Sequence, residues 1–227
     1  MKRHTVAGFT IIETMLFLAV SGALAVGLMA GMGAAIGAQQ YRDSVQSYAD
    51  FLRTQHSQVI TVVNNRSSED QCSLSAPESQ PRGRSSCVVV GRYITSTDTT
   101  GEKYTVRPIF ALQSGSGWTY AFGAEDTAYE THWSGTTRVN GQALNAANVH
   151  ILMWRSPDNG VLRIASTPPL NAESQIASAM AGASSDVELC VRADSLSFGE
   201  RLSVYLTANA GSSDAIRVAT ATGGCST

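Results

Sequence analysis

The stretch Gly8-Phe9-Thr10-Ile11-Ile12-Glu13 opens the apolar part of this 227-residue chain, and the fold is organised around it. A short basic segment, Met1-Lys2-Arg3-His4, precedes the stretch, and residues 14–41 contain no charged side chain. A helix of about 20 residues crosses the hydrocarbon core of a bilayer, so the apolar run over residues 9–38 is long enough to do so. The basic residues in front of it favour an orientation with the N-terminus in the cytoplasm.

Glu13 is the one ionisable side chain inside the apolar block, and it lies near the start of that block. A carboxylate in a membrane segment is costly, and residues of this kind usually have a function. So close to the interface, Glu13 could simply reach back to the cytoplasmic headgroups. The alternative is a charged partner, because a buried charge is stabilised by pairing.

Together, the basic lead, Gly8, Phe9 and Glu13, followed by a membrane-length helix, resemble the N-terminus of bacterial type IV prepilins and of type II secretion pseudopilins. The resemblance implies that a prepilin peptidase cuts between Gly8 and Phe9 and that the new amine on Phe9 is methylated. Glu13 would then pair with the N-terminal amine of a neighbouring subunit during assembly. The implied partners are other pilin subunits, the pilus assembly platform and, before assembly, the inner membrane. The implied location is a single-pass inner-membrane protein that becomes part of an extracellular or periplasmic filament.

A secretory signal peptide is the competing interpretation of the apolar run. It would place a small-residue cleavage site after the apolar core, and residues 34–38 (Ala-Ala-Ile-Gly-Ala) could supply one. The run is longer than the apolar region of a typical signal peptide, and it continues into a further helical pattern. Both features favour a retained membrane helix.

Glycine recurs along the apolar run, and its spacing allows helices to approach closely. The small-xxx-small pattern permits tight helix packing in membranes, although each glycine also weakens a helix by about 1 kcal/mol relative to alanine. Many major pilins carry a proline part-way down this helix, whereas this chain has none before Pro77. The difference favours a minor pilin or a pseudopilin. The glycines are Gly22, Gly27, Gly31, Gly33 and Gly37.

The helix is predicted to continue beyond the membrane with one apolar face. We therefore divide the chain into a leader (1–8), a long helix (9–64, transmembrane to about 38 and amphipathic from about 39) and a β-rich domain (65–227). The predicted apolar stripe consists of Tyr41, Val45, Tyr48, Phe51, Leu52, Val59, Ile60 and Val63. The predicted polar face contains Arg42, Asp43, Gln46, Asp50, Arg53 and Gln55.

The four cysteines all follow the apolar run, and an even number in a translocated domain predicts two disulfides. Pairing between sequence neighbours, Cys72 with Cys87 and Cys190 with Cys225, is the simplest of three possible connectivities. In the pilin resemblance, the second pair matches a C-terminal loop bounded by a disulfide.

Alternating apolar residues and turn signals predict an antiparallel β domain, which with the long helix gives an α+β fold shaped like a lollipop. Pro108 is expected to interrupt one strand, and residues 172–181 to form either a short helix or a loop. The predicted strands cover residues 88–90 continuing to 93–94, 104–112, 118–122, part of 131–139, 149–154, 161–165, 187–191, 202–207 and 216–219.

The sequence favours a structural subunit over an enzyme, because it contains no hydrolase elbow, zinc-protease, Walker or dinucleotide-binding motif. Neither a cofactor nor a metal is expected, and the acidic residues Glu125, Asp126 and Glu130 lack calcium-loop spacing. A formal charge of −2 argues against bulk nucleic-acid binding. Two alternatives stay open: a membrane-anchored extracytoplasmic binding domain that does not polymerise, and a DNA-binding minor pilin of an uptake system. Arg192, Arg201 and Arg217 would serve the latter.

Overall fold

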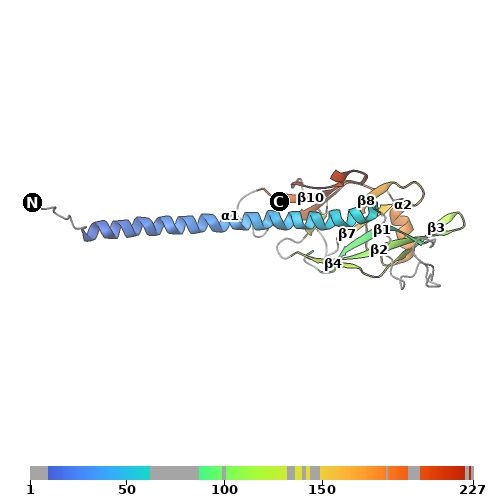
Figure 1. Cartoon of the computed structure of the whole chain (residues 1–227), viewed down its shortest axis with the longest axis horizontal. Coiled ribbons are helices and arrows are strands. Elements are labelled where there is room, and N and C mark those ends of the chain that lie inside the picture. The colour runs from blue at the N-terminus through green and yellow to red at the C-terminus, as the bar shows by residue number, and fades with distance from the viewer. Residues whose placement is uncertain are drawn as a thin grey trace, which may run out of the picture.

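The computed structural model describes residues 10–61, 87–98, 101–131, 136–139, 142–143, 149–182, 184–193, 200–222 and 225. The chain forms one long helix, α1 (Ile11–Ile60), and a globular part built from two antiparallel sheets and a short helix, α2 (Glu173–Ala181). We call this globular part the head. The first half of α1 projects away from the head, and the second half lies along it (Figure 1). The predicted α+β class with a long N-terminal helix is confirmed.

The larger sheet, sheet A, has six strands. Five of them follow the order β3-β2-β1-β7-β8, and the sixth, β4, pairs with the first part of β2, whereas β3 pairs with its last part. Every pairing in sheet A is antiparallel. The central strand β1 therefore lies between a hairpin partner and a strand that arrives from much later in the sequence. The strands are β1 (Cys87–Ser96), β2 (Lys103–Ser114), β3 (Gly117–Phe122), β4 (Thr127–Glu130), β7 (His150–Arg155) and β8 (Leu162–Ser166).

The smaller sheet, sheet B, has the order β11-β10-β9-β5-β6 and is also antiparallel. A disulfide between Cys190 in β9 and Cys225 closes its C-terminal part, with 5.1 Å between the two Cα atoms. This pair confirms one of the two predicted bridges. The elements are β5 (Thr136–Val139), β6 (Gln142–Ala143), β9 (Val187–Val191), β10 (Leu202–Leu206), a short 3-10 helix η1 (Ser213–Ala215) and β11 (Ile216–Thr220).

The main core forms where the second half of α1 packs against both sheets. The helix contributes residues at three- and four-residue steps, as an amphipathic stripe requires. Aromatic rings lie at the centre: the Phe51 and Tyr129 rings stack with centroids 4.4 Å apart, and the Tyr48 and Tyr104 centroids are 5.0 Å apart. The buried residues of α1 are Tyr41, Val45, Tyr48, Ala49, Phe51, Leu52, Gln55, His56 and Val59.

A second core lies on the opposite face of sheet A, under α2. Side chains of β7 alternate between the two cores, with Ile151 and Met153 in the first and Leu152 and Trp154 in the second. The α2 residue Ile176 is fully buried in the second core. Sheet A is thus covered by a helix on each face, and the residues 172–181 left open as helix or loop form a helix.

Two predictions about α1 were wrong in detail. Gln55 was assigned to the polar face, but it is buried because its Oε1 accepts a hydrogen bond from the buried Arg92 at 3.4 Å. Ile60 was assigned to the apolar stripe, yet it is 39% exposed at the end of the helix. Residues 62–64, which the prediction included in the helix, lie outside the described residues.

Pro108 does not interrupt β2, contrary to the prediction. The strand runs from Lys103 to Ser114, with Pro108 opposite Arg92 of β1. The Pro108 carbonyl accepts from the Gly123 N–H at 2.8 Å, on the side away from β1. Because the N–H and C=O of one strand residue point the same way, the missing N–H of Pro108 removes no bond to β1. Proline is tolerated here because β2 changes partner from β4 to β3 at this point.

Candidate functional site

The first half of α1, residues 11–38, has almost no contact with the rest of the chain. Large apolar side chains are exposed on every side of it, among them Ile11, Phe17 and Met29 at 71–77%. At 1.5 Å per residue, this segment is about 40 Å long, which exceeds the ~30 Å hydrocarbon core of a bilayer. α1 is the one helix in the described part of the chain that is long and apolar enough to cross a membrane.

Glu13 and Thr10 cap the start of α1 reciprocally. The Thr10 Oγ1 accepts from the Glu13 N–H at 3.3 Å, and the Glu13 Oε2 accepts from the Thr10 N–H at 3.2 Å. This capping box satisfies two N–H groups that the first turn of a helix leaves unpaired. It also directs the carboxylate back toward the N-terminal end of the chain. Negative charge is favourable there because it meets the positive end of the helix dipole.

Four glycines of the apolar half have no packing role within the described part of the chain. A methyl group built on Gly22, Gly27, Gly31 or Gly33 would meet no atom within 4 Å. Each of these residues nevertheless costs helix stability relative to alanine, by about 1 kcal/mol. A position that is weakened without any contact inside the monomer is open to close approach from another molecule.

Hydrogen bonds to the backbone of β10, of β11 and of the loop between them hold the second half of α1 in its place on sheet B. The Tyr41 hydroxyl accepts from the Leu202 N–H at 2.8 Å and donates to the Leu202 carbonyl at 3.1 Å. Further along, His56 Nε2 donates to the Ala210 carbonyl at 2.8 Å, and Arg53 Nε donates to the Ile216 carbonyl at 3.1 Å. Burial lowers the pKa of His56 below its usual value, although the Ala210 hydrogen bond partly opposes this. These contacts fix the direction in which the apolar half leaves the head.

The other predicted site residues are only partly described. Gly8 and Phe9, the predicted cleavage and methylation positions, lie outside the described residues. Cys72 also lies outside them. Cys87 is fully buried and disulfide-bonded. The pairing of Cys72 with Cys87 therefore stays a prediction.

Several of the charged residues considered for metal or DNA binding are engaged by neighbours. Glu130 Oε1 lies 3.5 Å from Lys103 Nζ, and Arg192 Nη1 lies 3.4 Å from a carboxylate oxygen of Glu102. The Arg217 guanidinium lies over the Tyr205 ring. Within the described ranges, no group of three or more His, Cys, Asp or Glu residues is arranged to hold a metal ion.

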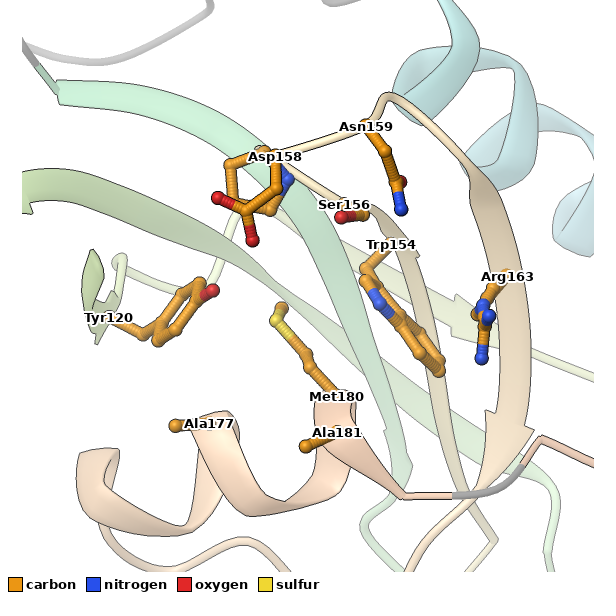
Figure 2. A pocket seen from close by; sticks show the side chains of 10 residues that line it. Tyr120, Trp154, Ser156, Asp158, Asn159, Arg163, Ala177, Met180 and Ala181 are labelled. Atoms are coloured by element: carbon orange, nitrogen blue, oxygen red, sulfur yellow. The ribbon is translucent and has the colours of Figure 1, made fainter. Parts of the chain in front are cut away.

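A pocket at the far end of the head was not predicted from the sequence. We call it the distal pocket; its volume is about 320 Å³, and it opens between the β7–β8 turn, β3 and α2 (Figure 2). The turn at 156–160 was expected, but nothing in the sequence indicated that α2 would lie across from it. The lining residues are Tyr120, Trp154, Ser156, Pro157, Asp158, Asn159, Arg163, Ala177, Met180 and Ala181.

Comparison with models of protein families, with curated proteins and with solved structures found no match to this chain. Arguments about function therefore rest on the residues and their geometry.

Proposed function

We propose that this chain is a structural subunit, a minor pilin or pseudopilin, of a filament resembling a type IV pilus. In this proposal the precursor is held in the inner membrane by the apolar half of α1 and is cleaved after Gly8. The new N-terminus is methylated on Phe9, and subunits assemble through their helices with the heads facing outward. The role is assembly and involves no catalysis.

The observation that carries the proposal is the division of a single helix into two different surfaces. From Tyr41 to Val59 the helix buries one face in the head, while residues 11–38 expose apolar side chains all round. A helix that is apolar on every side is stable only in lipid or among other apolar helices. The proposed subunit meets both environments: the membrane before assembly and the filament core after it.

Association between such helices gains little from the hydrophobic effect, because lipid tails are as apolar as the side chains they replace. Close packing therefore has to supply the attraction. Gly27 and Gly31, four residues apart on one face, have open space around them in the monomer. They support the proposal because they would let the backbone of a neighbouring helix approach.

Glu13 supports a charged contact near the N-terminus. After the proposed cleavage, the new α-amine would be on Phe9, directly before Thr10, whose N–H already donates to the Glu13 carboxylate. A carboxylate can accept about four hydrogen bonds, so the Glu13 carboxylate can still accept further hydrogen bonds after it forms the capping box. An isolated negative charge on Glu13 is unfavourable in an apolar environment, and an amine from a neighbouring subunit would neutralise it.

Two substitutions separate capping from charge pairing in cells that make the protein naturally. Glu13→Gln keeps the side-chain acceptor that a capping box needs but removes the charge, whereas Glu13→Ala removes both. If Glu13 pairs with an amine, both variants stay in the membrane as cleaved subunits and are lost from sheared filaments. Normal assembly of Glu13→Gln would reduce the role of Glu13 to helix capping.

Mass spectrometry of the N-terminal peptide tests the processing itself. We expect methylated Phe9 in the membrane fraction and as a minor component of sheared filaments. Abundant methylated Phe9 in filaments would indicate a major pilin instead. An intact Met1, or a chain beginning near Ala38, would contradict the proposal and return the protein to an anchored or secreted form.

The second candidate is a membrane-anchored binding domain that does not polymerise, and the distal pocket is the observation that favours it. The two candidates make opposite predictions for the N-terminus. In a simple anchor, Glu13→Ala is harmless, because removing a carboxylate from a membrane helix makes insertion easier.

A further inference from the structure

We propose that the distal pocket binds a neutral saccharide at the end of the head farthest from the membrane helix. Figure 1 places α2 and β3 at the end of the molecule opposite the N-terminus. The pocket volume of about 320 Å³ is at the lower end of the ~300–1,000 Å³ found for small-molecule sites. A site in this position stays accessible whether the helix lies in a membrane or in a bundle, so this proposal does not depend on assembly.

The walls of the pocket come from β3, β7, β8, the turn between β7 and β8, and α2 (Figure 2). Tyr120 lies on β3, Trp154 and Arg163 lie on neighbouring strands, and Asp158 stands on the turn between those strands. Trp154 and Arg163 are directly paired across β7 and β8, which places them on the same face of sheet A. α2 closes the opposite side through Met180 and two alanines.

The turn that carries Asp158 is held rigidly. The Ser156 N–H donates to the Val161 carbonyl at 2.8 Å, and the Gly160 N–H donates to the Ser156 carbonyl at 2.8 Å. Gly160 has a φ of 71°, a conformation that glycine adopts without strain. Trp118 Nε1 donates to Asp158 Oδ1 at 2.7 Å and so ties the turn to β3. A site fixed before binding loses little conformational entropy when a ligand enters.

The polar groups of the pocket combine opposite charges with neutral hydrogen-bonding groups. Asp158 Oδ2 has no hydrogen bond among the described residues, and neither does the Arg163 guanidinium. The two side chains lie on different walls (Figure 2), so a ligand with one net charge would meet attraction on one side and repulsion on the other. A sugar hydroxyl can donate to Asp158 or accept from Arg163, and it carries no charge itself.

The apolar part of the pocket completes the match to a saccharide. The half-buried Met180 and Tyr120 side chains form apolar surface between the polar walls, above Trp154, which is 2% exposed and forms the floor of the pocket. A pyranose ring presents C–H groups on its faces and hydroxyls around its edge, so it needs this combination. Ala177 and Ala181, four residues apart on α2, are both exposed and small. They leave the room that a longer side chain at either position would occupy.

The test uses the full chain in a detergent without a sugar headgroup, such as lauryldimethylamine oxide. The probes are the common hexoses, N-acetylhexosamines and their disaccharides, with glycerol and the dipeptide Gly-Gly as comparison ligands. Binding is followed by tryptophan fluorescence, since Trp154 lines the pocket and Trp118 bonds to Asp158, and by saturation-transfer NMR. We expect saturable binding of at least one saccharide with a Kd of about 1 mM or tighter.

Three variants locate the binding. Asp158→Asn and Ala181→Leu should each weaken it about tenfold or more, the first by losing a charged acceptor and the second by filling the pocket. The matched control is Arg155→Gln, because Arg155 is exposed on the same hairpin but on the opposite face of β7 from Trp154. It should bind like the unchanged protein. Circular dichroism confirms that every variant is folded.

Several results would overturn the proposal. These are saturable binding of none of the saccharides, binding that survives both pocket variants, and binding of Gly-Gly in preference to every sugar. Preferred binding of Gly-Gly would mean that Asp158 and Arg163 together bind a zwitterionic ligand. None of these results affects the proposed filament role, which is tested separately by the Glu13 variants and by mass spectrometry of the N-terminal peptide.

Discussion

Arg92 and Asp126 form an ion pair in which the arginine is almost fully buried. Arg92 Nη1 donates to Asp126 Oδ2 at 2.6 Å, and the two side chains are 4% and 35% exposed. Arg92 also donates to Gln55 Oε1 of α1, so a charged residue in the central strand connects the helix to the loop before β4. Its Nε is buried and lacks a hydrogen-bond partner in the described part of the chain.

The first prediction concerns the cost of leaving Arg92 unpaired. Breaking a buried ion pair typically costs about 3–5 kcal/mol, because the remaining charge has no partner. Asp126 is partly exposed, so we expect Asp126→Ala to lower the free energy of unfolding of the head by about 2 kcal/mol. Urea unfolding of the full chain in detergent, followed by tryptophan fluorescence, measures this change.

The double variant Arg92→Met/Asp126→Ala is the control for that result. It removes both charges and should recover part of the lost stability, although Gln55 then loses its donor. A double variant less stable than Asp126→Ala alone would show that Arg92 contributes mainly through its packing or its bond to Gln55.

The burial of Arg92 illustrates what sequence patterns leave undetermined. In β1, alternation alone places Arg92 on the α1 side of sheet A between Gly91 and Tyr93, with no sign of its partner 34 positions away. Gln55 was misassigned for the same reason, since its burial depends on Arg92. Polar residues become buried when tertiary contacts supply their partners, and a periodicity in one segment contains no information about those contacts.

Patterns that are local were predicted well. The apolar run of α1, the β7–β8 hairpin and the three C-terminal strands each depend on a short stretch of sequence. β6 has two residues, which is too short for a pattern, and neither β6 nor the four-residue β4 was predicted. Neither the separation into two sheets nor the distal pocket was predicted, because both depend on how distant segments pack.

The second prediction concerns Gly91 at the irregularity in the β1–β2 pairing. A methyl group on Gly91 would lie 2.7 Å from the Met153 carbonyl oxygen and 3.0 Å from Trp154 Cβ. Because the first of these atoms is backbone, the clash cannot be relieved by a rotamer change. Gly91→Ala should destabilise the head by about 1–3 kcal/mol, as overpacking does. Chemical unfolding measures the effect.

Gly117 in β3 offers a matched control, since a methyl group there would meet no atom within 4 Å. Gly117→Ala should leave stability unchanged or slightly raised. If both alanine variants were equally stable, the close approach of β1 and β7 at Gly91 would not be a constraint on the head.

The third prediction is a loss of stability in mild acid. Burial lowers the pKa of both His56 and His150 below the usual 6.5. Below pH 6.5 the unfolded chain therefore binds protons at these residues before the folded chain does. Stability is complete above pH 6.5 and falls as the pH drops toward the folded-state pKa values. Urea unfolding between about pH 7.5 and 5.5 should show this decline.

His56→Gln separates the contribution of His56, because a glutamine amide can also donate to the Ala210 carbonyl but does not titrate in this range. The variant should lose less stability on acidification than the unchanged protein. The remaining decline comes in part from His150, whose Nδ1 lies 2.6 Å from the Tyr93 hydroxyl and whose Nε2 is buried. An identical pH dependence in both proteins would mean that His56 titrates normally in the folded state.

The fourth prediction concerns Gly31 and follows from the proposed assembly. Gly31→Leu places a large side chain on the face where Gly27 and Gly31 would admit a neighbouring helix, while the monomer has open space there. Membrane insertion and unfolding of the head should be unchanged. A loss of about 1.4 kcal/mol per helix contact would reduce association about tenfold, so the variant should be depleted from sheared filaments to a similar extent. Quantitative mass spectrometry of filament and membrane fractions measures this ratio.

Gly31→Ala is the conservative partner of that experiment. Alanine remains small enough for close helix approach, and it should stabilise the helix by about 1 kcal/mol. Assembly should therefore be retained in Gly31→Ala and lost in Gly31→Leu if side-chain size at the contact is what matters. If both variants assemble normally, Gly31 faces away from neighbouring helices. If both fail, the backbone freedom of glycine is required, and local unwinding of the helix would be part of assembly.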